Sequence, residues 1–347
     1  MTFASTLLQW YSTHKRTLPW RGITDPYRIW LSEIILQQTQ IAQGRDYYLR
    51  FTEHFPSVEI LAEASEDEVM KLWEGLGYYS RARNLHAAAR QIVAHGSFPR
   101  HYEDVRALKG IGDYTAAAIC SIAYNDPIAT LDGNAYRVYG RIYSIEFPFD
   151  SKEGKAFYKE LANSLLDKTR PGEYNQAIMD FGATQCTPRN PNCEECPFTN
   201  SCGAHEEHKE NLFPVKAKKP IIKERFLNYF FIFLNDQILI HKRGNTDIWK
   251  GLYEPYLVET ECNRDIFALD DPWLNTVISG KGILKVHGRD IRHILTHRIL
   301  RTNFYSIHLA QCPQELPEGY YFCPTDHLDR IALPALIKKN MKLVFNP

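Results

Sequence analysis

Long apolar runs are absent from this chain of 347 residues, so no segment is predicted to span a bilayer. The apolar stretch from Phe3 to Trp10 is too short for a signal peptide, and disulfides are therefore not expected. Neither sign of charge is in excess. Lys and Arg total 41, as do Asp and Glu, so net charge neither favours nor excludes a nucleic-acid partner. No repeat or low-complexity tract is present. Because neither a membrane span nor a signal peptide is predicted, we expect a soluble, cytoplasmic protein.

The length is about twice that of a usual domain, which predicts two domains. With 44% hydrophobic and 24% charged residues, each domain can have its own core. Helical patterns dominate the first two hundred residues, and short β-rich runs follow a Pro-punctuated, Lys-containing stretch. We therefore predict a multi-domain protein with an all-α domain at 1–203, a linker at 204–224 and an α+β domain at 225–347.

Local signals place individual elements within these domains. Asp25 before Pro26 predicts a helix at 26–36, and the capping box that begins at Ser65 predicts one that ends near Gly75. A further helix is expected from 81 to 95. In the second domain, strands are predicted at 226–234, 237–242, 253–259, 283–286 and 303–309, with a terminal helix from 334 to 342.

Four of the eight cysteines form a C-x6-C-x2-C-x5-C run: Cys186, Cys193, Cys196 and Cys202. Thiolates at this short, irregular spacing in a turn-rich segment can converge on one metal centre. Structural zinc usually shows paired C-x2-C knuckles, and only one close pair is present here. The spacing therefore favours a [4Fe-4S] cluster over zinc, and disulfides less than either. The other four cysteines are scattered singly and are predicted to be ordinary thiols.

Residues 108–116, LKGIGDYTA, predict two helices joined by a hairpin that contains Gly110 and Gly112. Glycines allow close approach of the backbone to a ligand, and the N–H groups that open the second helix suit a phosphate. A plain helix–helix turn would give the same pattern. Asp132 heads a helix predicted at 133–143, and the residues alone are explained by an N-cap worth about 1 kcal/mol. A helix N-terminus also favours the ionised form of a carboxylate.

The helical segment 30–40, WLSEIILQQTQ, carries one carboxylate, Glu33. From the residues alone a solvent-facing position is favoured, because burying a carboxylate is costly. This string is very similar to the signature of the adenine DNA glycosylases of the MutY type. The hairpin and the cysteine spacing resemble those of the iron–sulfur base-excision glycosylases of the helix-hairpin-helix superfamily. The resemblance implies that Glu33 protonates the departing adenine while ionised Asp132 faces the sugar cation.

Tyr114 bears on the reaction type. Endonuclease III-type relatives have a lysine there that attacks the sugar as an amine, whereas a phenol cannot form a Schiff base. The resemblance therefore implies a monofunctional enzyme that uses water. It also implies that Tyr114 and Asn134 line the site near Asp132, and that Asp180 occupies a further carboxylate position.

The segment 75–84, GLGYYSRARN, is also similar to the family pattern. An enzyme that acts on a stacked base must extrude it, and inserted side chains offset the cost. By resemblance, the residues expected to probe the opposite base are Gln38, Thr39, Leu76 and Tyr78. Without the family, Leu76 and Tyr78 would be interpreted as a hydrophobic staple at a helix end.

The second domain resembles the Nudix-like domain of the same family, through the string WKGLYEP at 249–255. The paired-glutamate pattern that binds magnesium in Nudix hydrolases is missing, so pyrophosphatase activity is not expected. The implied role is recognition of 8-oxoguanine. Leu295, Thr296 and His297 stand where many members have Phe-Ser-His, and the hydroxyl and imidazole are expected to contact the lesion. From the residues alone, an exposed β-turn would explain them.

Taken over nearly the whole chain, the resemblance implies a monomer with a [4Fe-4S] cluster, acting without a membrane. Its expected substrate is adenine paired with 8-oxoguanine or guanine in double-stranded DNA. Two alternatives stay open. One is an endonuclease III-like glycosylase and lyase that acts on oxidised pyrimidines, and the other is a non-catalytic sensor of DNA lesions.

Overall fold

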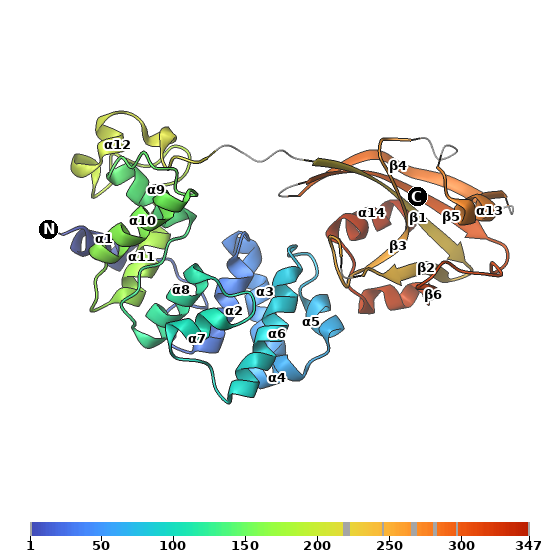
Figure 1. Ribbon diagram of the computed structural model, residues 1–347, viewed down its shortest axis with the longest axis horizontal. Coiled ribbons are helices and arrows are strands. Elements are labelled where there is room, and N and C mark those ends of the chain that lie inside the picture. The colour runs from blue at the N-terminus through green and yellow to red at the C-terminus, as the bar shows by residue number, and fades with distance from the viewer. Residues whose placement is uncertain are drawn as a thin grey trace. The chain divides into compact units, whose positions relative to one another are not determined.

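The computed structural model describes residues 2–217, 223–244, 246–264, 269–279, 283–295 and 298–345 (Figure 1). Two compact units make up the chain. The first joins Met1–Ala64 to Asn84–Lys218, and the second joins Ser65–Arg83 to Lys219–Pro347. The second unit thus contains a segment that the sequence pattern placed in the helical domain. Among the described helices, none combines the length and apolarity needed to cross a membrane.

The first unit is helical. Its elements are α1 (Phe3–His14), α2 (Pro26–Leu36), α3 (Ile41–His54), α4 (Val58–Glu63), most of α6 (Ser80–His95), α7 (Tyr102–Ala107), α8 (Asp113–Tyr124), α9 (Gly133–Ile142), α10 (Lys152–Leu165), α11 (Pro171–Thr184), α12 (Gly203–Glu206) and the 3-10 turns η1 (Thr199–Ser201) and η2 (Glu210–Leu212). The predicted cap of α2 is confirmed, because the Asp25 carboxylate accepts a hydrogen bond from the Tyr27 backbone N–H at 3.0 Å.

A core of buried aromatic and aliphatic side chains from α1, α9, α10 and α11 organises one end of this unit. Tyr139, Tyr158 and Phe181 are fully buried in it. Three of the clustered cysteines pack against the same core. Because α9 begins directly after Asp132, this packing fixes both that carboxylate and the cysteine loop on a shared support.

The second unit contains a six-stranded sheet. Its strands are β1 (Lys223–Leu234), β2 (Gln237–Lys242), β3 (Tyr253–Thr260), β4 (Ile283–Ile294), β5 (Arg298–Leu309) and β6 (Tyr320–Pro324), and its helices are α5 (Glu66–Leu72), α13 (Pro272–Ser279), α14 (Ala335–Phe345) and the 3-10 helix η4 (Thr325–Arg330). The strand order is β4-β5-β1-β3-β2-β6, and β1 and β5 run parallel to each other. Alternate residues of β1 enter two cores, one with side chains of α14 and one with side chains of α13.

The predicted strands at 283–286 and 303–309 exist but are longer than expected. In the structure β4 and β5 are antiparallel partners over their length, with irregular register near Gly288. Most β4 side chains are exposed or half-buried, so this strand lacks the apolar alternation by which a sequence reveals a strand. The predicted capping box of α5 is confirmed, since Ser65 Oγ accepts from the Glu68 N–H at 3.2 Å. That helix ends at Leu72, before the predicted position near Gly75.

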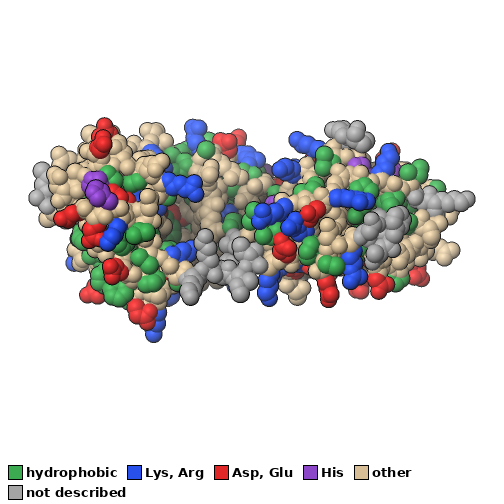
Figure 2. Space-filling model, turned by 90° about the horizontal axis from the view of Figure 1, so that it is seen from above, with side chains coloured by type: hydrophobic (Ala, Val, Ile, Leu, Met, Phe, Trp, Pro, Cys, Tyr) green, Lys and Arg blue, Asp and Glu red, His purple; other side chains and the backbone are tan. Residues whose placement is uncertain are grey.

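Figure 2 shows acidic and basic side chains over the whole of the face that it presents. This distribution matches the equal totals of the two charges in the sequence. Overall charge therefore does not locate a functional surface. The location follows instead from where specific polar side chains converge.

Candidate active site and metal centre

A cavity in the helical unit brings together all but one of the predicted catalytic residues, and Thr39 as well. Glu33 on α2, Tyr114 on α8, Asp132 before α9 and Asn134 within it all line this cavity. They come from segments up to a hundred positions apart in the sequence, so the helical packing alone assembles them. Two titratable carboxyl groups facing one cavity are the arrangement that glycosidic-bond cleavage requires.

The first carboxyl group, Glu33, is tied to Tyr114. The phenol hydroxyl donates a hydrogen bond to Glu33 Oε2 at 2.8 Å. Burial raises the pKa of Glu33 above its ordinary 4.5, and the Tyr114 hydrogen bond and the charge of Arg21 oppose that rise. Burial also raises the pKa of Tyr114 well above 10, which keeps the phenol neutral and able to donate. Glu33 therefore faces the cavity, whereas the residues alone favoured a position on the solvent-facing side of the helix.

The second carboxyl group, Asp132, is the N-cap of α9. Its Oδ1 accepts from the Ala135 N–H at 2.7 Å, and its Oδ2 accepts from Asn134 Nδ2 at 2.6 Å. Burial raises the pKa of Asp132 above 3.8, and these hydrogen bonds together with the charge of Arg137 act in the opposite direction. The helix N-terminus favours ionised Asp132, but loss of contact with water on burial opposes ionisation of the same carboxyl group.

Arg137 connects this carboxyl group to the cysteine loop. Its Nη2 donates to Asn134 Oδ1 at 2.8 Å and to the Gly182 carbonyl at 2.6 Å. Its Nε donates to the Cys186 carbonyl at 2.9 Å. One side chain therefore fixes the residue that hydrogen-bonds Asp132 and the first cysteine of the run.

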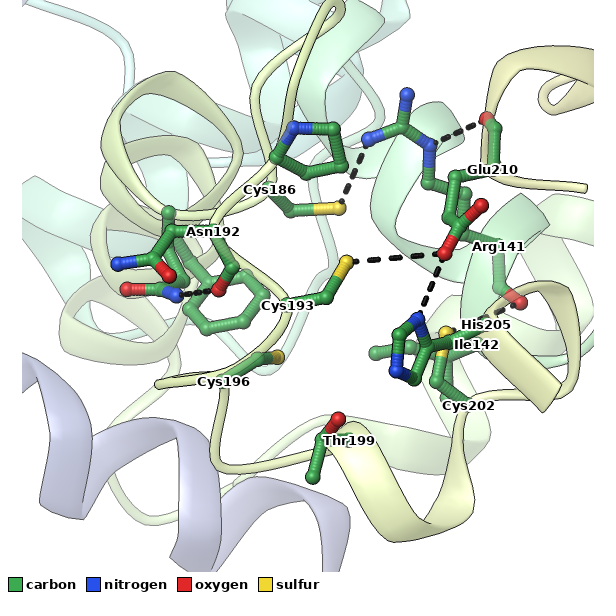
Figure 3. A pocket seen from close by; sticks show the side chains of 13 residues that line it. Arg141, Ile142, Cys186, Asn192, Cys193, Cys196, Thr199, Cys202, His205 and Glu210 are labelled. Atoms are coloured by element: carbon green, nitrogen blue, oxygen red, sulfur yellow. Dashed lines mark hydrogen bonds and ion pairs between the residues drawn. The ribbon is translucent and has the colours of Figure 1, made fainter. Parts of the chain in front are cut away.

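The four clustered cysteines face one cavity, and none of them forms a disulfide (Figure 3). Arg141, almost fully buried, covers one side of it. Its guanidinium donates to Cys186 Sγ at 3.3 Å, to the Thr187 carbonyl at 2.7 Å and to the Pro188 carbonyl at 3.1 Å. Four thiols around a common space, with a cation against one of them, fit a cluster of iron and sulfide held by thiolates.

A second group of potential ligands overlaps the first. Cys193, His205 and Glu210 place ligand atoms within 4.8 Å of one another, and His205 Nδ1 lies 2.7 Å from Glu210 Oε1. Such a trio could hold a zinc ion, the alternative left open by the sequence. Because it uses Cys193, it would compete with a four-cysteine centre rather than add to it.

Comparison with known families covers both units and the loop. Residues 31–162 match the model of the HhH-GPD superfamily of base excision DNA repair proteins. Residues 186–202 match the iron–sulfur binding domain of endonuclease III, and residues 228–343 match the NUDIX domain. The iron–sulfur match begins at the first clustered cysteine and ends at the last.

Similar proteins are named adenine DNA glycosylases. The chain is 35% identical over 315 residues to the adenine DNA glycosylase of Buchnera aphidicola subsp. Baizongia pistaciae. This match covers 87% of the present chain and 85% of the relative. The chain belongs to the adenine DNA glycosylase family. It is 41% identical over 237 residues to the Mus musculus member and 42% over 215 residues to the Homo sapiens member. These matches cover 65% and 59% of this chain and only 46% and 39% of the two relatives, so the chain spans less than half of their length.

Solved structures agree with the predicted fold of the helical unit. A thermostable thymine-DNA glycosylase is 31% identical, with a TM-score of 0.55 over 59% of this chain and 95% of that chain. Endonuclease III trapped in a covalent intermediate with DNA is 18% identical, with a TM-score of 0.52 over 59% and 94% of the two chains. The second likeness concerns the fold alone. The HhH-GPD and NUDIX matches confirm the prediction of a helix-hairpin-helix glycosylase domain followed by a Nudix-like domain.

The family match decides between the two candidate metal centres. In this member of the adenine DNA glycosylase family, residues 186–202 form an iron–sulfur binding segment, and Cys186, Cys193, Cys196 and Cys202 are the thiols that face its cavity and would hold a [4Fe-4S] cluster. Bound there, the cluster would cross-link the loop between α11 and α12. His205 and Glu210 then lie beside the cluster rather than holding a separate ion.

Asp180, predicted as a further carboxylate of the site, is paired with arginines in the structure. This residue of α11 is fully buried, and its carboxylate accepts from the Arg16 backbone N–H at 3.1 Å and from Arg21 Nη2 at 2.9 Å. The Arg16 guanidinium also pairs with it, at 2.5 Å. Asp180 itself is not among the residues that line the cavity. In the structure its oxygens therefore contact two arginines, Arg16 and Arg21.

Both of these arginines line the active-site cavity, as does Gln176, and the sequence patterns pointed to none of them. Arg21 Nε is buried and has no hydrogen-bond partner within the described part of the chain. A donor in that state is available to a polar ligand. Arg16 and Arg21 precede α2 in an irregular segment, where nothing in the sequence reveals a partner as distant as Asp180.

The residues predicted to contact DNA differ from one another in their surroundings. Thr39 lines the active-site cavity, and Gln38 next to it is exposed, with a φ of 55°. Gly110 has a φ of 79°, and a Cβ there would lie 2.6 Å from the Asn84 Cβ, so only glycine fits. Gly112, the N-cap of α8, has open space where a Cβ would lie. This hairpin therefore leaves room for a close approach by a ligand.

Two further pairs of residues complete the set. Leu76 is buried, whereas Tyr78 is 47% exposed. Of the two, only Tyr78 is accessible to DNA without rearrangement. Thr296 and His297 lie outside the described residues. The flanking Leu295 N–H donates to the Arg298 carbonyl at 2.8 Å between β4 and β5.

Glu33→Gln is expected to stabilise the protein at neutral pH. The folded state raises the pKa of Glu33, so folding favours the protonated carboxyl group. That contribution is fully present below pH 4.5 and is lost as the pH rises through the raised pKa. Glutamine retains an acceptor for the Tyr114 hydroxyl and never ionises. Thermal unfolding should show a higher Tm for the variant at neutral pH and nearly equal values below pH 4.5. A lower Tm for the variant at neutral pH would contradict the raised pKa.

Proposed function

We propose that this chain hydrolyses the N-glycosidic bond of adenine in double-stranded DNA, where adenine is paired with 8-oxoguanine or guanine. The observation that carries the proposal is the cavity that combines a half-buried, hydrogen-bonded Glu33–Tyr114 pair with Asp132. Membership of the adenine DNA glycosylase family supports adenine as the base. Since the helical unit encloses the site, the adenine must leave the duplex to reach it.

The two carboxyl groups divide the reaction. Glu33 has a raised pKa and can hold a proton, which it gives to the base as the C1′–N9 bond breaks and the bond electrons leave with the adenine. Asp132, as a carboxylate, stabilises the positive charge on the sugar. Water then bonds to C1′ and returns a proton to the Glu33 carboxylate. The products are free adenine and an abasic strand, and Glu33 is protonated again.

Other residues of the cavity hold this arrangement. Tyr114 orients Glu33 through its hydroxyl and offers no amine for attack on the sugar, which supports a monofunctional enzyme. Asn134 fixes one oxygen of Asp132. The guanidinium of Arg21 and the amide of Gln176 supply hydrogen-bonding groups suited to the polar edge of a flipped base. No step needs the [4Fe-4S] cluster, which stabilises the loop beside the site.

The same proposal assigns recognition of the opposite base and contact with the duplex to residues of both units. Thr296 and His297 between β4 and β5 would recognise 8-oxoguanine, and Tyr78, Gln38 and Gly112 would contact the duplex. We propose that the enzyme acts as a monomer. A second candidate substrate is thymine, favoured by the 31% identity to a thymine-DNA glycosylase.

Single-turnover excision separates the candidates. The iron-loaded protein is incubated in excess with duplexes that contain adenine opposite 8-oxoguanine, guanine or cytosine, with thymine opposite guanine, and with thymine glycol. We expect the fastest release from adenine opposite 8-oxoguanine, slower release opposite guanine and no release of thymine or thymine glycol. Release of thymine but not adenine would transfer the assignment to the second candidate. Binding without any release would indicate a lesion sensor.

A further inference from the structure

Residues 73–79, here called the wedge loop, link α5 to α6 and present one strained aromatic residue. Gly75, Gly77 and Tyr78 have φ angles of 98°, 73° and 48°. For a tyrosine the left-handed conformation is strained, because its Cβ comes close to the following carbonyl oxygen. It persists only where the surrounding structure imposes it. The exposed Tyr78 ring therefore has a conformation that depends on what holds the loop.

Some of the contacts that fix the wedge loop come from neighbouring residues in the sequence. The Gly77 carbonyl, directly before Tyr78, accepts from Trp73 Nε1 at 3.0 Å and from Arg81 Nη2 at 3.3 Å. The Arg81 guanidinium also lies 5.4 Å from the centre of the Tyr78 ring and 5.1 Å from that of Trp73. These contacts fix the peptide that enters the strained residue.

The other contacts that fix the loop come from residues 331–338, here called the strap, which run from the end of η4 through the first turn of α14. The wedge loop and the strap belong to the same compact unit although about 260 positions separate them. The Leu333 N–H donates to Glu74 Oε1 at 3.1 Å, and the Leu333 carbonyl accepts from the Tyr79 hydroxyl at 3.3 Å. That hydroxyl also accepts from the Gly75 N–H at 3.2 Å. Both polar backbone groups of Leu333 thus bind the loop on either side of Tyr78.

Charge reinforces this connection. The Glu74 side chain is only 6% exposed, and its Oε2 pairs with Lys338 of the strap and with Lys71 of α5 at 3.0 Å. Lys71 Nζ also donates to the Ile331 carbonyl at 3.0 Å. A largely buried carboxylate needs such partners, and removing one leaves charge poorly compensated. Glu74 therefore links the loop to the strap by hydrogen bond and by ion pairs together.

We propose that the strap of the Nudix-like domain sets the conformation of Tyr78, so that this domain controls how the enzyme probes the base opposite the adenine. The inference rests on the proposed function for its DNA readout. Under this inference, Glu74 and Lys338 are positioning residues that act through Tyr78 and touch neither adenine nor sugar. The specificity for 8-oxoguanine then depends on contacts within the protein as well as on contacts with the lesion.

Lys338→Met tests the connection, because it removes the ammonium group and keeps an apolar stem of similar length. We expect the ratio of single-turnover rates for adenine opposite 8-oxoguanine and opposite cytosine to fall by about tenfold, the effect of losing one partner of a buried charge. Lys338→Arg should restore most of the ratio. Lys342→Met, an exposed lysine of the same helix, is the matched control and should leave it unchanged. Tyr79→Phe, which removes a single hydroxyl, should lower the ratio in the same direction and serves if Lys338→Met does not fold.

A double-mutant cycle with Tyr78→Ala decides whether the effect passes through the wedge. If it does, Lys338→Met should lower the ratio little further once Tyr78 is alanine, because coupled residues are non-additive. Independent, multiplying effects, or wild-type ratios in both Lys338→Met and Tyr79→Phe, would overturn the inference.

Chymotrypsin cleavage after Tyr78 provides a readout that needs no DNA. A loop released from the strap should be cut faster in Lys338→Met than in Lys342→Met. Equal cleavage would contradict the inference even if the wild-type enzyme released no adenine, so the two proposals fail separately.

Discussion

Asp132→Asn is expected to slow adenine release by about a thousandfold or more, because a neutral amide cannot stabilise the developing sugar cation. The substitution also places an NH2 group against Asn134, which now donates to Asp132 Oδ2 at 2.6 Å. The side-chain oxygen can still accept from the Ala135 N–H, so the cap of α9 should survive. Single-turnover excision and DNA binding are measured on the same preparation, and we expect binding to be retained.

A second capping aspartate provides the control for that variant. Asp25 accepts from the Tyr27 N–H at the start of α2 and does not line the cavity. Asp25→Asn should leave adenine release close to that of the wild type, since asparagine caps helices about as well as aspartate. If Asp132→Asn released adenine at an undiminished rate, Asp132 would be a structural cap only.

Cys196→Ala is expected to have the second large effect, on the fold rather than on the chemistry. Without one of its four thiolates the loop should lose its cluster, and iron content should fall by about tenfold or more. Because metal binding and folding of such a loop are coupled, Tm and DNA affinity should fall with it. Three of the clustered cysteines pack against the core that holds α9, so the damage should spread towards Asp132.

The exposed Cys312 supplies the matched control for the cluster. Cys312→Ala should retain iron, Tm and DNA affinity. Iron content, the absorbance of the cluster and thermal unfolding are measured for both variants. An iron-free Cys196→Ala protein that melted and bound DNA like the wild type would show that the cluster does not stabilise the fold.

The sequence predicted the elements whose signals are local. Asp25 and Ser65 cap helices where expected, and the short spacing of the cysteines predicted one metal centre. The family resemblance added Glu33 and Asp132, which the residues alone explained as a solvated side chain and a plain cap. Their convergence on one cavity results from the packing of α2, α8 and α9, which no local pattern encodes.

What the sequence did not predict depends on distant partners. Asp180 looks like a free carboxylate on a helix until the structure pairs it with Arg16 and Arg21, more than 150 positions away. The contacts of Glu74 with Leu333 and Lys338 are of the same kind. Side-chain burial, and with it the direction of the pKa shift of Asp132, also becomes visible only when the neighbours are in place.

The most direct test of the central claim is to identify both products of the wild-type, iron-loaded enzyme on a duplex with adenine opposite 8-oxoguanine. Mass spectrometry measures free adenine, and alkaline cleavage of the strand counts the abasic sites. Borohydride is added in parallel to trap any Schiff base. We predict one free adenine for each abasic site and no trapped protein–DNA adduct. Absence of free adenine, or a trapped adduct formed at the rate of base release, would contradict hydrolysis by Glu33 and Asp132.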